Sequence, residues 1–177
     1  MKKIAILVLA LLIGGATYSQ KTVTRVGEIK FDATVPGAVD EVIGNNKTVS
    51  SIFDKSTGKL VVQGMVKSFK FKSPLMEEHF NENYMESDKF PKTSFKGKVL
   101  GYEGKAGSYD AEGDLTIHGV TNKVKTKVTV GTDGGKVTIA GNFTIKLADY
   151  KIDVPALAKK TLAETSKISF KLALENK

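Results

Sequence analysis

Cysteine is absent from the 177-residue sequence. The fold therefore contains no disulfide bond, and its stability must come from packing and strand pairing. The same absence excludes a thiol nucleophile and a lipid anchor attached through cysteine. Histidine is scarce, since His79 and His118 are the only two. Cysteine and histidine, which often serve as nucleophiles, general bases or metal ligands, are therefore absent or scarce.

Long apolar runs are also missing, except near the start of the chain. Residues 4–15 are almost wholly apolar and follow the basic pair Lys2 and Lys3. This run is too short to span a bilayer, whereas a charged start before a short apolar segment is typical of a signal peptide. We predict that residues 1–19 are a signal peptide, that residues 20–177 form one domain, and that the protein is periplasmic or secreted.

Acidic residues are in the minority, and the formal net charge is +8. This charge permits contact with anionic lipid head groups, nucleic acid or polyanionic polymers, although lysines spread over a solvated surface explain it equally well. Phe95, Phe143 and Phe170 alternate with lysines and so face away from them, whereas single-stranded nucleic acid binds aromatic and basic side chains together. We predict no nucleic-acid partner and retain a membrane surface as a candidate contact.

Catalytic and metal-binding motifs are missing as well. The sequence has no Gly-x-Ser-x-Gly elbow, no His-Glu-x-x-His pair and no glycine-rich phosphate loop. Glu78 and Glu82 lie near His79, but a zinc site needs three or four converging ligands. The acidic residues of segment 110–114 alternate with apolar ones and so point outward together. We predict that the protein is not an enzyme and binds no metal or cofactor.

Alternation of apolar and polar residues covers most of the remaining chain and indicates strands with one buried face. Eight such segments are separated by turn-forming residues: 23–31, 48–53, 60–71, 92–100, 109–117, 124–130, 137–145 and 168–174. In segment 60–71 the apolar residues move from even to odd positions after Val66. We attribute this change of phase to a bulge near Lys67 or Ser68. Segments 74–84 and 155–163 break the alternation and are helix candidates.

Glycine occupies several positions in the apolar phase where a core would ordinarily carry a side chain. These positions are Gly27, Gly64, Gly97, Gly113 and Gly141. Glycine on the concave face lets a sheet coil tightly and close. We predict an all-β fold, an eight-stranded antiparallel barrel with one or two short helices. A closed barrel of this size is filled by side chains or holds one small ligand.

Two segments of the chain resemble the YceI-like family. Residues 76–97 (MEEHFNENYMESDKFPKTSFKG) combine a histidine-containing stretch, an acidic residue before an aromatic-proline pair, and a strand with phenylalanine. Residues 113–121 (GDLTIHGVT) follow in the family's order and spacing. The resemblance extends through most of the domain and departs from the family at Tyr150, where relatives often carry tryptophan after an aspartate.

The resemblance implies a lipocalin-like barrel whose apolar tunnel holds a polyisoprenoid or another long-chain lipid, without catalytic residues. Our main hypothesis is an exported binding protein that holds an isoprenoid or fatty-chain lipid in its lumen. The alternative is a structural or stress-related envelope protein with a filled barrel and no lipid ligand. The alternation shows which side chains point inward but not whether they fill the barrel, so both hypotheses stand. No sequence pattern indicates the oligomeric state.

The inward phase also predicts which residues contact a ligand. On the central strands these are Phe69, Phe71, Phe95, Val99, Leu115, Ile117, Ile139 and Phe143. Arg25 alternates with Gly27 and Ile29, so we expect it to project inward at a barrel mouth and to bind a carboxylate or phosphate group. The alternative is an arginine near a frayed terminus that is paired or solvated at the surface.

Overall fold

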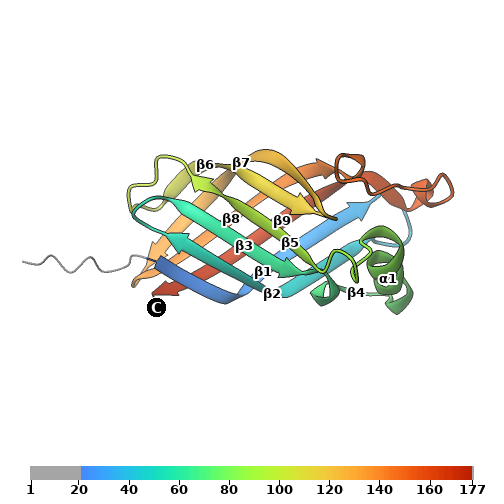
Figure 1. Ribbon diagram of the computed structural model, residues 1–177, viewed down its shortest axis with the longest axis horizontal. Coiled ribbons are helices and arrows are strands. Elements are labelled where there is room, and N and C mark those ends of the chain that lie inside the picture. Colours follow the sequence, from blue (N-terminus) through green and yellow to red (C-terminus); the bar gives the residue numbers. More distant parts are fainter. Residues whose placement is uncertain (1–20, 177) are drawn as a thin grey trace, which may run out of the picture.

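The alternating segments form one antiparallel sheet that closes into a barrel (Figure 1). The structure, a computed structural model, describes residues 21–176. The strands are β1 (Lys21–Thr34), β2 (Ile43–Asp54), β3 (Lys59–Met65), β4 (Lys70–Phe71), β5 (Lys92–Val99), β6 (Gly107–Ile117), β7 (Val120–Asp133), β8 (Lys136–Lys146) and β9 (Leu162–Asn176).

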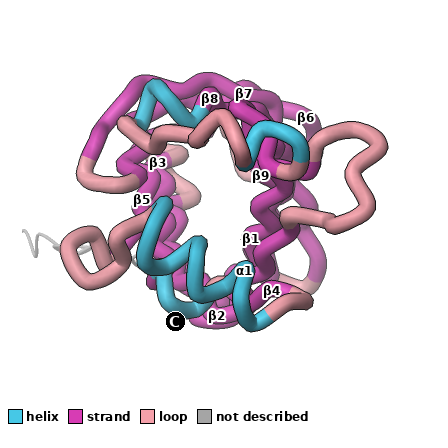
Figure 2. The backbone as a smooth tube through the Cα atoms, turned by 90° about the vertical axis from the view of Figure 1, so that its right-hand side faces the viewer, coloured by secondary structure: helices cyan, strands magenta, loops and turns pink. Residues whose placement is uncertain are grey.

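Strand pairing confirms the predicted eight-stranded antiparallel barrel. The order around the sheet is β1-β9-β8-β7-β6-β5-β3-β2, and pairing of β1 with β2 closes the ring. The two-residue strand β4 adds to one end of β2 and takes no part in closure. Figure 2 looks along the barrel from the end where α1 (Pro74–His79) lies and shows the strands as a ring.

The first helix candidate, segment 74–84, is helical but changes its hydrogen-bond pattern half-way. Ser73 caps α1 by accepting a hydrogen bond from the Met76 N–H, and Pro74 occupies the first turn, where its missing N–H costs nothing. The chain then continues as a π-helical turn, η2 (Phe80–Tyr84). No helix in the described part of the chain is long and apolar enough to cross a membrane.

The second helix candidate, segment 155–163, was predicted wrongly. It contains only a 3₁₀ turn, η4 (Ala158–Lys160). Ala158 packs against the core, whereas Ala156 and Leu157 are exposed. A short helix depends on packing of an apolar face, and this segment has too few inward side chains to supply one.

The phase change in segment 60–71 is present, but the predicted bulge is wrong. β3 ends at Met65, and a 3₁₀ turn, η1 (Val66–Ser68), leads to β4. The Val66 N–H donates to the Pro91 carbonyl and the Phe69 N–H donates to the Val66 carbonyl. Both Val66 and Phe69 are buried, so the turn keeps two apolar side chains in the core across the break.

Two of the inward glycines explain how closely the strands coil. Gly97 on β5 is paired with Gly113 on β6. A Cβ atom on Gly97 would lie 2.2 Å from the Glu112 carbonyl oxygen, and one on Gly113 would lie 2.5 Å from the Gly97 Cα. Neither position has room for a side chain, so glycine permits the close approach on which barrel curvature depends.

The acidic and basic residues of β6 and β7 form a ladder of ion pairs on the outer face. Lys123 lies 2.8 Å from Asp114, and Lys127 and Lys125 lie 3.2 and 3.5 Å from Asp110. Exposed pairs of this kind contribute about 0–1 kcal/mol each. The basic stripe of β7 is therefore neutralised by its neighbouring strand.

The interior of the barrel divides into two clusters. One fills the end opposite α1, and we call it the packed end: Val49, Phe53, Leu60, Val99, Ala111, Val128, Val130, Val137, Ile139, Leu172 and Leu174. The other cluster lies toward α1 and includes residues of η2 and of the 3₁₀ turn η3 (Leu147–Tyr150). The second cluster surrounds a cavity.

Candidate functional site

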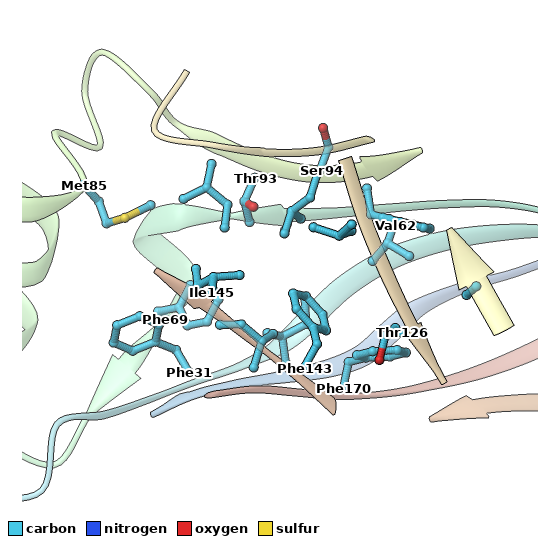
Figure 3. A pocket seen from close by; sticks show the side chains of 18 of the residues that line it. Phe31, Val62, Phe69, Met85, Thr93, Ser94, Thr126, Phe143, Ile145 and Phe170 are labelled. Atoms are coloured by element: carbon cyan, nitrogen blue, oxygen red, sulfur yellow. The ribbon is translucent and has the colours of Figure 1, made fainter. Parts of the chain in front are cut away.

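An apolar cavity of about 110 Å³ lies inside the barrel between the packed end and η2. We call it the inner cavity. Its apolar lining comes from seven of the eight barrel strands, all except β2, and from the segments that cover one end: Ile29, Phe31, Leu60, Val62, Phe69, Phe80, Met85, Phe95, Ala111, Leu115, Ile117, Val124, Val128, Phe143, Ile145, Leu147, Ile152, Ile168 and Phe170. Figure 3 shows ten of the lining residues by label.

The inner cavity offers little for polar recognition. The remaining lining residues are Gly64, Thr93, Ser94 and Thr126, and no charged side chain lines it within the described chain. The Thr93 hydroxyl donates to the Thr116 carbonyl at 2.9 Å, and the Thr126 hydroxyl donates to the Asn142 carbonyl at the same distance. Because these hydroxyls are engaged by backbone, the inner cavity fits an apolar chain.

Phe80 separates the inner cavity from a second space nearer the surface. Its ring lies 5.7 Å from that of Phe31, 5.6 Å from that of Phe69 and 4.8 Å from that of Phe71. The second space, the outer pocket, has a volume of about 200 Å³. Its lining is Phe31, Val42, Phe71, Met76, His79, Phe80, Tyr84, Met85, Leu147, Ile152, Ala158, Thr161 and Leu162. Five residues line both spaces, so they are neighbours divided by side chains.

A polar depression, the polar basin, adjoins the outer pocket at the surface. It is lined by His79, Asn83, Tyr84, Glu86, His118, Lys151, Ile152, Asp153 and Pro155. His79, Tyr84 and Ile152 line the outer pocket as well. The three spaces therefore form a series that runs from a largely apolar interior to a polar surface. Across residues 21–176, no three acidic or histidine side chains converge to hold a metal ion.

His118 holds together three segments at the edge of the polar basin. With Gly119 it forms the two-residue turn between β6 and β7. Its Nδ1 lies 3.1 Å from the Tyr150 carbonyl oxygen, and its Nε2 lies 3.0 Å from a Glu86 carboxylate oxygen. The imidazole ring therefore bridges the β6–β7 turn, η3 and the chain just after η2.

The backbone at this edge is unusual. Glu86, His118 and Lys151 are the non-glycine residues with positive φ in the described chain, at 40°, 49° and 58°. Left-handed backbone at such residues persists where surrounding contacts enforce it. Here the Glu86–His118 contact and the hydrogen bond to Tyr150 supply those contacts.

The Glu86 carboxylate is held in its charged form. It accepts hydrogen bonds from Lys89 and His118, and these lower the pKa of Glu86 below its ordinary value. Glu77 on α1 behaves similarly, because hydrogen bonds from Lys70 and the Phe71 N–H lower its pKa. The α1–η2 segment is therefore attached to the barrel through a carboxylate near each of its ends.

The residues predicted to contact a ligand fall into three places. Phe69, Phe95, Leu115, Ile117 and Phe143 line the inner cavity, and Phe71 lines the outer pocket. Val99 and Ile139 are fully buried in the packed end and line neither space. The inward phase thus located interior side chains, but it did not show where the interior is filled. Ligand contact by these residues stays a prediction.

Several lining residues were not identified from the sequence. Phe80 and Met85 lie on or just after η2, and Leu147 and Ile152 lie on or just after η3. None belongs to a strand, so the two-residue alternation carried no signal for them. The helical spacing of apolar residues in segment 74–84 was the one available signal for Phe80.

Arg25 lies on β1, but its side chain is outside the described residues. The register of β1 against β2 shifts between Thr24 and Gly27, which interrupts the alternation that placed Arg25 with Gly27. Thr24 pairs with Ser51, near Phe53 of the packed end. This part of β1 is far along the strand from α1 and the polar basin.

Comparison with known families decides which family this barrel represents. The family model described as the YceI-like domain matches residues 17–174. The chain belongs to the YceI-like family. No curated protein matches the chain.

Solved structures share the fold of this YceI-like domain. The Burkholderia cenocepacia protein BcnA has 19% sequence identity and a TM-score of 0.71, over 85% of this chain and 96% of BcnA. A polyisoprenoid binding domain from Saccharophagus degradans, implicated in plant cell wall breakdown, has 15% identity and a TM-score of 0.75, over 90% and 100%. A Campylobacter jejuni YCEI protein has 20% identity and a TM-score of 0.63, over 78% and 88%.

Proposed function

We propose that the protein is an exported binding protein that holds the isoprenoid or fatty chain of a lipid in the inner cavity. The observation that carries the proposal is a barrel interior lined by apolar side chains, without a charged group, beside an outer pocket of similar character. Burial of an apolar chain there is favourable by about 0.8 kcal/mol per CH₂ group. The similarity to the Saccharophagus degradans polyisoprenoid binding domain supports this class of ligand.

The polar basin supports a neutral, hydrogen-bonding head group. Lys151 and Asp153 bring charges of opposite sign, and Glu86 is paired with Lys89 and His118. A diphosphate would favour a cluster of cations, whereas this surface offers donors and acceptors in a balanced mixture. We place the lipid tail in the inner cavity and its polar end toward the basin.

Binding accounts for this interior better than catalysis does. The inner cavity has neither a nucleophile with an adjacent base nor a pair of carboxylates among its lining residues. The filled barrel considered above describes the packed end, where side chains fill the core, but not the half that contains the inner cavity.

Gly64 provides a direct test of the cavity. A Cβ atom at Gly64 would meet its nearest neighbours at 3.5 Å, which is ordinary van der Waals contact, and the position lines the inner cavity. Gly64→Leu should fill space that the lipid tail occupies, and it should weaken binding of a fluorescent fatty-chain probe by roughly tenfold or more. Gly64→Ala is the matched control and should bind nearly as the wild type does.

Extraction of the purified protein with organic solvent, followed by mass spectrometry, identifies any bound lipid directly. A folded Gly64→Leu variant that binds the probe as tightly as Gly64→Ala, together with a lipid-free extract, would reject the proposal. Circular dichroism and thermal unfolding establish that each variant is folded.

A further inference from the structure

Three large apolar side chains are exposed on segments at the end of the barrel where α1 lies. Val39 is 97% exposed, Leu157 is 95% exposed and Leu75 is 59% exposed. They come from the loop between β1 and β2, the turn before η4, and α1. All three segments lie at the right-hand end of the barrel in Figure 1. Single exposed hydrophobic residues are common on protein surfaces, but several at one end of a molecule are typical of an interaction surface.

Each of these residues lies within three positions in the chain of a side chain of the outer pocket. Met76 follows Leu75, Ala158 follows Leu157, and Val42 lies three residues after Val39. The segments that form the wall of the outer pocket therefore also present an apolar side chain to solvent. We call Val39, Leu75 and Leu157 the rim residues.

The opposite end of the barrel lacks this feature. Its loops, residues 55–58, 100–106 and 134–135, contain no large hydrophobic residue that is strongly exposed among the described positions. Serine, threonine, lysine and glycine predominate there. The contrast places exposed apolar side chains at the end that contains the openings and polar ones at the packed end.

We infer that the rim residues insert into the surface of a lipid bilayer, so that the outer pocket opens directly toward the membrane. The inference rests on the proposed function, because a lipid must otherwise cross water to reach the inner cavity. Exposing its chain to water is unfavourable in proportion to the apolar area exposed, and contact between the rim and the bilayer avoids that exposure. Apolar residues at an interface bind membranes in proportion to the area that they bury.

Charge plays the smaller part in this contact. Lys72 and Lys160 lie near Leu75 and Leu157, but Asp40 and Glu41 directly follow Val39. A rim of mixed sign gains little from an anionic surface, whereas apolar insertion needs none. Vesicles of zwitterionic phosphatidylcholine should therefore be sufficient for binding, and salt should change it little.

The test is flotation of the purified protein with phosphatidylcholine vesicles, combined with uptake of a fluorescent fatty-chain lipid. The triple variant Val39→Asp, Leu75→Asp, Leu157→Asp should bind vesicles roughly tenfold or more weakly than the wild type, and it should extract the lipid from vesicles correspondingly more slowly. Its uptake of the same lipid from a dilute dispersion without vesicles should match the wild type. Val26→Asp is the matched control, because Val26 is 71% exposed on β1 away from the rim.

Equal vesicle binding by wild type and triple variant would overturn the inference, as would the same loss in Val26→Asp. A wild type that takes up lipid from dispersion but does not bind vesicles would overturn it too and would leave the proposed function intact. No uptake from dispersion by any variant would instead overturn the proposed function, while flotation would still decide whether the rim contacts membranes.

Discussion

Leu115 and Thr116 are neighbours on β6 whose side chains lie on opposite faces of the barrel. Leu115 is buried and lines the inner cavity, whereas the Thr116 hydroxyl lies 2.8 Å from that of Thr121 at the surface. Leu115→Lys should lower the free energy of unfolding by several kcal/mol or prevent folding, because it buries an unpaired charge. Thr116→Lys should be nearly neutral. Urea unfolding of both variants checks this, and equal effects would show that the assigned faces are wrong.

Arg25 carries the most specific prediction about a single side chain. If Arg25 binds an anionic head group, Arg25→Ala should weaken binding of a fatty acid by about 1.5–3 kcal/mol, the contribution of a charged hydrogen bond, whereas a head group at the polar basin leaves this affinity unchanged. Binding of the corresponding fatty alcohol should change little. Titration of both ligands into wild type and variant measures the difference. Unchanged fatty-acid affinity would reject the role and favour recognition at the polar basin.

The stability of the fold should depend on pH through Glu86, which attaches the α1–η2 segment to the barrel. Hydrogen bonds from Lys89 and His118 lower the pKa of Glu86 below its ordinary value of 4.5. A carboxylate of this kind stabilises the fold above its ordinary pKa, and that contribution is lost as the pH falls through the lowered value. The urea midpoint of wild type should therefore exceed that of Glu86→Gln near neutral pH, and the difference should disappear in acid. Glu82→Gln, at an exposed position of η2, is the control and should follow the wild type throughout.

Phe80 is the residue of η2 that separates the inner cavity from the outer pocket. Phe80→Ala should join the inner cavity to the outer pocket and lower the free energy of unfolding by about 3 kcal/mol. Release of a bound fluorescent lipid should become faster, because the ring between the two spaces is gone. Stopped-flow displacement measures the release rate. Phe53→Ala removes the same atoms from the packed end and should destabilise the fold without faster release. Equal acceleration in both variants would argue against a specific role for Phe80.

Strands were more predictable from the sequence than the segments between them. Alternation places β5, β6 and β8 within two residues of their observed ends, because each has one buried face over its whole length. The break near Lys67 or Ser68 was located, but not its form, since a bulge and a 3₁₀ turn produce the same change of phase. Segment 155–163 has helix-forming residues, and its conformation depends on packing that the sequence does not show.

At the scale of the whole molecule, export remains a prediction that rests on residues 1–19, which lie outside the described part of the chain. Removal of this segment in the host should leave a chain that begins near Gln20 and contains no disulfide. Intact-mass measurement and N-terminal analysis of the protein recovered from the host check both points. A membrane-embedded chain that begins at Met1 would contradict them.

The candidate site was only partly predictable, because a cavity is a property of the assembled barrel. Phe95 and Leu115 could be placed inside from their own strands, but so could Val99 and Ile139, which occupy filled space. Whether an inward side chain meets a cavity depends on the residues across the lumen. Ile152, which lines the inner cavity, the outer pocket and the polar basin, belongs to no strand and was missed for that reason.

The packed end closes one end of the lumen, so a lipid can enter and leave only at the other end. A lipid bound as we propose enters tail first and leaves head first, without turning around inside the protein. Its polar end faces outward in every bound state, so any acceptor meets the same end of each guest. An enzyme could therefore modify that end while the tail remains shielded from water.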